Sequence, residues 1–164
     1  MLRFVRPGDA AAIAEIYNYY ITETVISFDE ELTTAAEMEE RIARISAEYP
    51  WLVLEEGGAL LGYAYAHRWH ERAAYRYTAE VSIYLRQGLE GRGLGTALME
   101  RLLEELRKTE IHALISCLTL PNEGSTALHE KFGFSQAGHY REVGSKFGQL
   151  LDVGYWELIL GKDR

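Results

Sequence analysis

The sequence predicts an α/β fold in which one mixed β-sheet carries helices on its faces. Segments with helical spacing alternate with strand-like segments, and only short breaks separate them. No internal repeat or low-complexity tract interrupts this order. The chain has 164 residues, of which 48% are apolar. That length and composition suit one domain, residues 1–164, with a core of ordinary size.

The first predicted element is a short strand over Leu2–Val5. The Pro7-Gly8-Asp9 stretch marks a turn, and Asp9 is expected to serve as the N-cap of a helix. The apolar residues of that helix recur at intervals that place them on one face: Ile13, Ile16 and Tyr20.

A second helix and a hairpin are expected next. Thr34 and Glu37 have the spacing of a capping box. The helix after them carries apolar residues at helical intervals: Met38, Ile42 and Ile45. Strands are predicted over Trp51–Glu55 and Leu60–His67, because the Glu56-Gly57-Gly58 stretch between them is a hairpin signal.

The C-terminal half continues the alternation. Glu80–Leu85 alternates polar and apolar residues, as a half-buried strand does. After a glycine-rich stretch, leucines recur every fourth residue and predict an amphipathic helix: Leu94, Leu98, Leu102 and Leu106. The remaining predicted elements are a buried strand over His112–Leu120, a short helix from about Ser125 to Gly133, and strands around Ser135–Val143 and Leu151–Leu160.

Charge and composition exclude several classes of protein. The formal net charge of −8 argues against a general binder of nucleic acids or acidic membranes. No apolar stretch reaches membrane-spanning length and no export signal is evident, so we expect a cytoplasmic protein. Cys117 is the one cysteine, which excludes an intramolecular disulfide, and we expect it to be a small core residue. His67 and His70 lack a partner cluster of ligands, so no metal site is expected.

Residues 88–103, GLEGRGLGTALMERLL, place glycines directly before a helix. Glycine loses more backbone entropy on folding than any other residue, so something is expected to approach this backbone closely. An anion is the usual ligand at a helix N-terminus. A P-loop is excluded, because Leu94 and Gly95 stand where Lys and Ser or Thr are required, and the dinucleotide fingerprint lacks its third glycine. A plain turn before an amphipathic helix is the alternative.

The strand, the loop with Gly93-Leu94-Gly95 and the helix together resemble the acyl-CoA pyrophosphate loop of the GNAT superfamily of N-acetyltransferases. The family motif, Gln/Arg-x-x-Gly-x-Gly/Ala, falls on residues 90–95, with Glu90 in place of Gln or Arg. Because a carboxylate repels a pyrophosphate at contact range, Glu90 is expected to point away, and Arg92 to offset its charge. The resemblance implies acetyl-CoA contacts from Ile83, Leu85, Gly91, Arg92, Gly93, Leu94, Gly95 and Thr96.

A second segment, PNEGSTALHEKFGF at residues 121–134, is similar to the GNAT segment that contacts pantetheine and the nearby phosphates. Asn122 and Ser125 match the contacting residues, and His129 stands where many members carry a tyrosine that protonates the leaving thiolate. That histidine, with AYRYTAEVSIYL, SFDEE and GQLLDVGYWEL, resembles the phosphinothricin, methionine sulfone and methionine sulfoximine N-acetyltransferase branch. The resemblance implies a GNAT fold, with a mostly antiparallel sheet of about seven strands and about four helices, direct acetyl transfer to the α-amino group of a small amino-acid analogue, and a homodimer.

Acetyl transfer from a thioester to an amine needs a neutral amine, a polarised carbonyl and a protonated leaving thiolate. By the resemblance, Glu80 lies at the end of the substrate cleft. We expect Glu80 to accept the ammonium proton, directly or through water, and His129 to donate a proton or contact substrate. The structural alternatives are a strand glutamate paired with a surface Lys or Arg, and a helical histidine that interacts with the helix dipole.

Substrate contacts are expected from the loop over Arg68–Thr78. Arginine binds carboxylates through two parallel hydrogen bonds, which suits an amino-acid substrate. By the resemblance, Arg72 and Tyr75 match substrate-contacting residues of the branch, and Phe28 matches an aromatic residue of the pocket. The alternative is that the loop arginines form a solvated charge cluster. Acetylation of a peptide N-terminus or another amine, or a CoA-binding sensor without useful catalysis, are the other functions left open.

Overall fold

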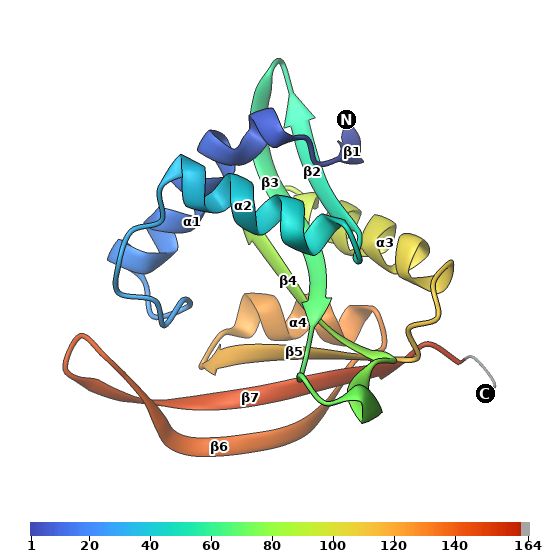
Figure 1. The fold of residues 1–164 in the computed structure, drawn as a ribbon. Coiled ribbons are helices and arrows are strands. Elements are labelled where there is room, and N and C mark those ends of the chain that lie inside the picture. The colour runs from blue at the N-terminus through green and yellow to red at the C-terminus, as the bar shows by residue number, and fades with distance from the viewer. Residues whose placement is uncertain (162–164) are drawn as a thin grey trace.

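The computed structural model describes residues 1–161, and these form a seven-stranded sheet with four α-helices packed on it (Figure 1). The strands are β1 Leu2–Phe4, β2 Trp51–Glu56, β3 Ala59–Arg68, β4 Thr78–Leu85, β5 Ala113–Leu120, β6 Ser135–Lys146 and β7 Gln149–Ile159. The α-helices are α1 Ala10–Glu23, α2 Ala35–Ser46, α3 Leu94–Arg107 and α4 Glu123–Lys131. The predicted fold class is confirmed, and every predicted strand is present with ends within three residues of those expected.

The sheet has the order β1-β2-β3-β4-β5-β7-β6. β4 and β5 are parallel, whereas all other neighbouring strands in this order are antiparallel. The parallel pairing is short, since it joins only Thr78–Glu80 to Ala113–Ile115. Beyond these residues β4 and β5 diverge, as Figure 1 shows, and the sheet is split near its centre.

Helices cover both faces of the sheet. α1 and α2 pack on β2, β3 and β4 through one apolar cluster that includes Ile13, Ile42 and Trp51. α3 and α4 pack on the opposite face, where the predicted leucine stripe of α3 is buried together with Trp156. The spacing of the apolar residues along each helix thus determines which side of that helix packs on the sheet. Within residues 1–161 no helix is long and apolar enough to cross a membrane.

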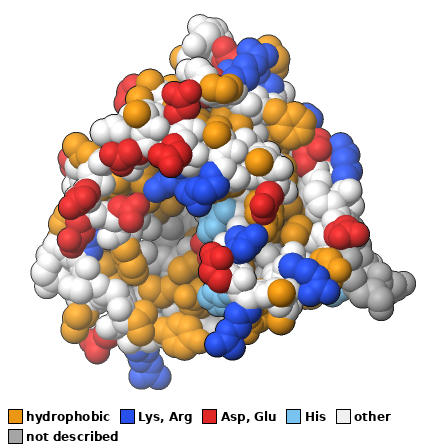
Figure 2. Space-filling model, in the orientation of Figure 1, with side chains coloured by type: hydrophobic (Ala, Val, Ile, Leu, Met, Phe, Trp, Pro, Cys, Tyr) orange, Lys and Arg blue, Asp and Glu red, His pale blue; other side chains and the backbone are white. Residues whose placement is uncertain are grey.

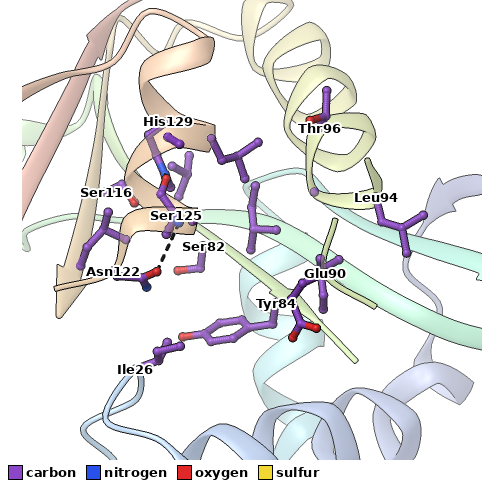
Figure 3. A pocket seen from close by; sticks show the side chains of 18 of the residues that line it. Ile26, Ser82, Tyr84, Glu90, Leu94, Thr96, Ser116, Asn122, Ser125 and His129 are labelled. Carbon is purple, nitrogen blue, oxygen red and sulfur yellow. Dashed lines mark hydrogen bonds between the residues drawn. The ribbon is translucent and has the colours of Figure 1, made fainter. Parts of the chain in front are cut away.

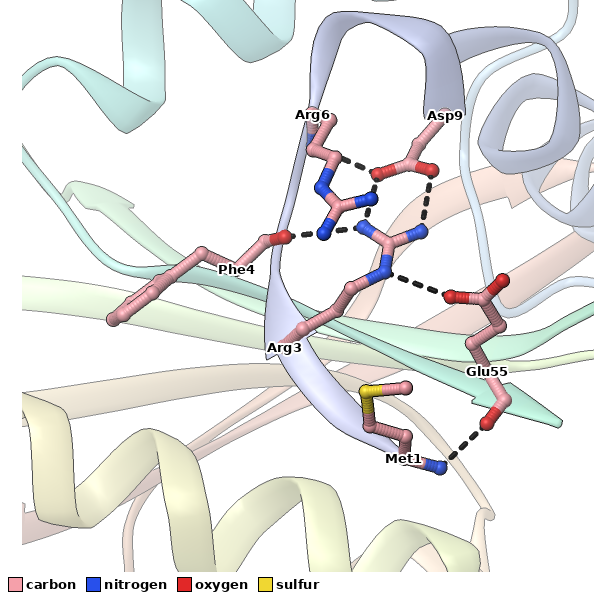
Figure 4. A network of polar contacts seen from close by, with 6 residues as sticks. All are labelled: Met1, Arg3, Phe4, Arg6, Asp9 and Glu55. Carbon is pink, nitrogen blue, oxygen red and sulfur yellow. Dashed lines mark hydrogen bonds and ion pairs between the residues drawn. The ribbon is translucent and has the colours of Figure 1, made fainter. Parts of the chain in front are cut away.

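Asp9 occupies the predicted N-cap position of α1, but its side chain makes no capping hydrogen bond to that helix. Its carboxylate accepts hydrogen bonds from both terminal nitrogens of Arg3, at 2.8 and 2.9 Å, and from the Arg6 amide (Figure 4). Arg3 Nε also donates to Glu55 on β2. A bidentate, charge-assisted pair is stronger than a hydrogen bond to a neutral amide, which explains why the carboxylate turns to Arg3.

The other predicted helix ends agree better with the structure. Thr34 Oγ1 accepts the Glu37 amide at the start of α2, which is one of the two hydrogen bonds of a capping box. α4 begins two residues earlier than predicted, because Asn122 supplies its N-cap and accepts the Ser125 amide. Gly133 follows α4 with a φ of +92°, as expected of a C′ glycine.

Candidate active site

A cleft of about 500 Å³ occupies the split between β4 and β5. Val81–Leu85 of β4 line one side and Ser116–Thr119 of β5 line the other, while the N-terminal part of α3 and residues along the length of α4 close its ends (Figure 3). On the molecular surface, a hollow lies between the part formed by α1 and α2 and the part formed by β5–β7 (Figure 2). The cleft exists because two parallel neighbours stop pairing after Glu80.

The glycine-rich loop forms the α3 end of the cleft. Gly91 and Gly93 have φ values of +80° and +77°, a left-handed conformation that favours glycine. Gly93 is the N-cap of α3 and offers no side chain to cap it. The first amides of α3 therefore lack intrahelical acceptors and lie beside the cleft, which suits a pyrophosphate.

Most of the residues predicted to bind the cofactor line the cleft: Ile83, Leu85, Gly91, Gly93, Leu94, Gly95, Thr96, Asn122 and Ser125. Arg92 instead reaches towards Glu56, with 3.6 Å between the charged atoms. Lys131, which no sequence motif indicates, also lines the cleft, and its Nζ lies 3.5 Å from Thr96 Oγ1. In the sequence, a lysine near the end of a predicted helix indicates a favourable contact with the helix dipole and not a ligand contact.

Glu90 also lines the cleft, and its orientation away from a bound pyrophosphate stays a prediction. Its side chain lies on the Tyr84 side in Figure 3 and is close enough to Tyr20 to raise the pKa of that phenol. Burial is the larger cause of the raised Tyr20 pKa. The acidic group therefore occupies the α1 side of the cleft, apart from the α4 side that carries Lys131.

His129 lines the cleft from α4 and is only 3% exposed. Its Nδ1 lies 2.7 Å from the Ser125 carbonyl oxygen, and a carbonyl oxygen only accepts, so Nδ1 carries a proton. Burial lowers the pKa of His129, which favours the neutral ring. In that ring Nε2 holds a lone pair, so His129 can accept a proton before it can donate one at this atom.

Glu80 is the last residue of β4 that pairs with β5, at the closed end of the split. The alternative interpretation of Glu80 was a strand residue paired with a surface Lys or Arg. Its partner is instead His67, whose Nε2 lies 3.3 Å from Glu80 Oε2 across the β3–β4 pair. Glu80 also lies close enough to Cys117 and Tyr155 for its charge to raise the pKa of both. Cys117 lines the cleft, so Glu80 is a neighbour of the cleft wall.

The prediction that Cys117 is a core residue is wrong, since the thiol is exposed and lines the cleft. β4 pairs with β5 only as far as Ile115, so Cys117, two residues further along β5, has no paired β4 residue beside it. The continuous apolar pattern predicted burial on both faces and could not reveal the split.

The substrate residues expected from the sequence lie outside the cleft wall. Arg72 is exposed and precedes a short 3-10 turn at residues 73–75. Tyr75 contacts the rings of Trp69 and His70 edge-on, at 5.2 and 5.3 Å between centroids. These aromatic contacts within the loop hold Tyr75 in place, and sequence spacing gave no sign of them.

Phe28 follows α1, and its ring lies against Gly144 of β6. The adjacent Asp29 lies close enough to Tyr65 and Tyr84 to raise the pKa of each, as does Glu80. Burial is the main cause of both shifts. The Phe28 segment and Glu80 thus lie near the same two tyrosines.

Lys146 anchors the Phe28 segment to the sheet. It is 2% exposed, and its Nζ donates to the carbonyl oxygens of Tyr20, Thr24 and Ser27. These carbonyls lie at the end of α1 and in the segment after it, where acceptors lack helical partners. Because the contact joins residues far apart in the chain, the sequence alone did not indicate it.

The cleft opens between two parallel strands and leads to the uncapped N-terminus of α3. Glu80 and His67 form an acid–imidazole pair at its closed end. This arrangement is that of a transferase with an anionic, extended co-substrate. The family described as "Acetyltransferase (GNAT) domain" matches residues 2–154. The chain belongs to the GNAT acetyltransferase family.

Relatives of known name support this membership. A phosphinothricin N-acetyltransferase of Streptomyces viridochromogenes is 35% identical over 93% of this chain and 85% of the relative. An L-methionine sulfoximine/L-methionine sulfone acetyltransferase of Salmonella typhimurium is 34% identical over 97% of this chain and 94% of the relative. A solved Salmonella typhimurium acetyltransferase structure, which contains its cofactor acetyl-CoA, matches with a TM-score of 0.96 and 33% identity, covering 100% of this chain and 95% of that one.

Proposed function

We propose that this enzyme transfers acetyl from acetyl-CoA directly to the α-amino group of a small amino-acid analogue such as methionine sulfone, methionine sulfoximine or phosphinothricin. The observation that carries the proposal is the position of Glu80, at the closed end of the split whose open part leads to the uncapped N-terminus of α3. The two named relatives act on amino-acid analogues of this kind.

Acetyl-CoA supplies an activated thioester. The free amides at the start of α3 would bind its pyrophosphate, with Lys131 as the neighbouring cation. The diverging edges of β4 and β5 expose backbone groups that no longer pair with each other, and these are available to the pantetheine arm. In the part of the chain that the structure describes, no three His, Cys, Asp or Glu side chains gather as a metal site.

The first chemical requirement is a neutral amine, since an ammonium has no lone pair. Glu80 takes one proton from the substrate ammonium, directly or through water. The amine nitrogen then attacks the thioester carbonyl, so that a C–N bond forms and the C–S bond breaks.

His129 handles the second proton. A neutral ring whose Nδ1–H is held by the Ser125 carbonyl can only accept a proton, at Nε2. It therefore takes the proton that the attacking nitrogen loses and passes it to the departing thiolate. This assignment makes His129 a shuttle, which refines the expectation of a simple donor.

Arg72 and Tyr75 would contact the substrate carboxylate and side chain, and Phe28 would cover its apolar part. We further propose one domain over residues 1–164 that works in the cytoplasm as a homodimer. Large apolar side chains are exposed on the β6–β7 hairpin, and burying them against a second copy would remove them from water: Tyr140, Val143, Phe147 and Leu150. Sedimentation velocity would show a monomer if this part of the proposal is wrong.

The test is CoA release with acetyl-CoA and a panel of amines: methionine sulfone, methionine sulfoximine, phosphinothricin, methionine, a polyamine and a short peptide. We expect turnover of the first three and none of the last two. Glu80→Gln should lower kcat by about 100-fold or more, while the exposed control Glu104→Gln keeps it. Binding of acetyl-CoA without turnover of any amine would contradict the proposal and favour a sensor.

A further inference from the structure

We propose that His67 is a positioning residue that orients Glu80 and relays its proton to solvent. The inference rests on the proposed function, because it takes Glu80 to be the group that accepts the ammonium proton. Each turnover leaves one proton on Glu80, and the enzyme cannot accept the next substrate until that proton has gone. Within residues 1–161, His67 lies at ion-pair distance from Glu80 and is placed to receive it.

The hydrogen bonds of His67 fix its tautomer. Nδ1 lies 2.9 Å from the carbonyl oxygen of Arg68, and a carbonyl oxygen only accepts, so Nδ1 is the protonated nitrogen. In the neutral ring Nε2 then carries a lone pair, and this atom lies 3.3 Å from Glu80 Oε2. The Nε2 lone pair can therefore accept a proton that Glu80 has gained.

The other ionisable neighbours of Glu80 cannot serve as the relay. Tyr65, Tyr84, Cys117 and Tyr155 face it from β3, β4, β5 and β7. Burial raises the pKa of all four, and the pKa of Tyr155 reaches about 12. They hold their protons near pH 7, whereas the Nε2 lone pair of His67 is free to accept one.

A proton on His67 can pass to solvent, because the side chain is partly exposed. The His67 side chain is 28% exposed, and Glu80 is 26% exposed. The neighbouring charges on β3 and the loops beside it are Arg68, Glu48 and Glu71, and the two carboxylates pair with Arg68 rather than with His67.

The transfer balances without any further reactant. Glu80 takes a proton from the ammonium and becomes a neutral acid. That proton moves to His67 Nε2, which restores the carboxylate and leaves an imidazolium. The imidazolium gives the proton to water, and the pair returns to its starting state.

Kinetics of His67→Gln test the relay. Glutamine can still donate a hydrogen bond to Glu80 but cannot carry a proton. We expect kcat to fall about tenfold, with an unchanged KM for acetyl-CoA, and added imidazole to restore part of kcat in proportion to its concentration. His139→Gln is the matched control, because it breaks another histidine–carboxylate pair, His139–Asp152 at 2.8 Å, outside the cleft.

The outcomes separate the relay from the proposed function. Wild-type kcat in His67→Gln, together with loss of activity in Glu80→Gln, overturns the relay and leaves the proposed function standing. Wild-type kcat in both variants removes Glu80 as the base and overturns the catalytic assignment itself. A fall in His67→Gln that imidazole does not relieve also overturns the relay, since the residue would then act through structure alone.

A measurement without substrate tests the geometry. Long-range 1H–15N spectra of the histidine-labelled enzyme at about pH 8 distinguish the two neutral tautomers, and His67→Gln identifies the signal. We expect the Nδ1–H tautomer for His67. An Nε2–H tautomer would contradict the hydrogen bond to Arg68 and with it the relay.

Discussion

The ring of Phe28 lies directly against the backbone of Gly144, a residue of β6. A Cβ at position 144 would come within 2.4 Å of Phe28 Cζ, so β6 can pass the ring only without a side chain there. Lys146, two residues further along β6, donates to three carbonyls at the end of α1 and in the segment after it. The position of Phe28 is therefore set by the C-terminal hairpin.

Gly144→Ala should displace the Phe28 ring and raise the KM for the amino-acid substrate about tenfold, because one misplaced contact costs on the order of 1.4 kcal/mol or more. Gly138→Ala is the control in the same strand, since its Cβ would meet Tyr155 at an ordinary 3.9 Å. Steady-state kinetics with methionine sulfone would measure both. Equal KM values for the two variants would show that Phe28 does not border the substrate.

Gly93→Ala should weaken acetyl-CoA binding. A Cβ there meets nothing within 4 Å, but the φ of +77° is strained for alanine by about 1–2 kcal/mol. Relief of that strain would reorient the first amides of α3. Calorimetric titration with CoA should show a rise in Kd of about tenfold. Gly8→Ala, which also has open space but no positive φ, should bind CoA normally.

Alkylation of Cys117 should block the cleft. It is the single cysteine, so one mass addition identifies the site. Solvent reaches the thiol, but the atoms packed around it desolvate it and raise its pKa, so labelling by a maleimide should accelerate as the pH becomes alkaline. Bound CoA should slow the labelling. Equal rates with and without CoA would place the thiol outside the CoA site.

The Arg3–Asp9 pair should make stability depend on acid pH. The Arg3 hydrogen bonds lower the pKa of Asp9 below its ordinary value of 3.8. A carboxyl with a depressed pKa in the folded state stabilises the fold above the ordinary value, and that contribution is lost as the pH falls through the folded one. Asp9→Asn should cost about 2–4 kcal/mol at pH 7 and flatten the acid side of the urea-unfolding profile.

The exposed variant Glu39→Gln is the control for this measurement. Its free energy of unfolding should stay within about 0.5 kcal/mol of the wild-type value at every pH. If Asp9→Asn kept the wild-type acid profile, the Asp9 carboxyl would not be the group that titrates.

Local sequence patterns predicted much of the architecture correctly. The leucine spacing of α3 identified its buried side, and the paired glycines after Glu56 identified the β2–β3 hairpin. The failures were side chains whose partners lie elsewhere in space. Asp9 had the residue type and position of a cap but found Arg3 instead, and Cys117 had an apolar neighbourhood in sequence but faces the cleft.

The sequence by itself determined the order of elements, their apolar faces and the glycine-rich loop before α3, because these depend on spacing within a few residues. Only the tertiary structure decided that β4 and β5 part after Glu80, that His67 is the partner of Glu80, and that Lys146 holds the Phe28 segment. Each of these depends on which distant segments become neighbours. Burial and charge act through space, so the chain's local pattern cannot specify those pairings on its own.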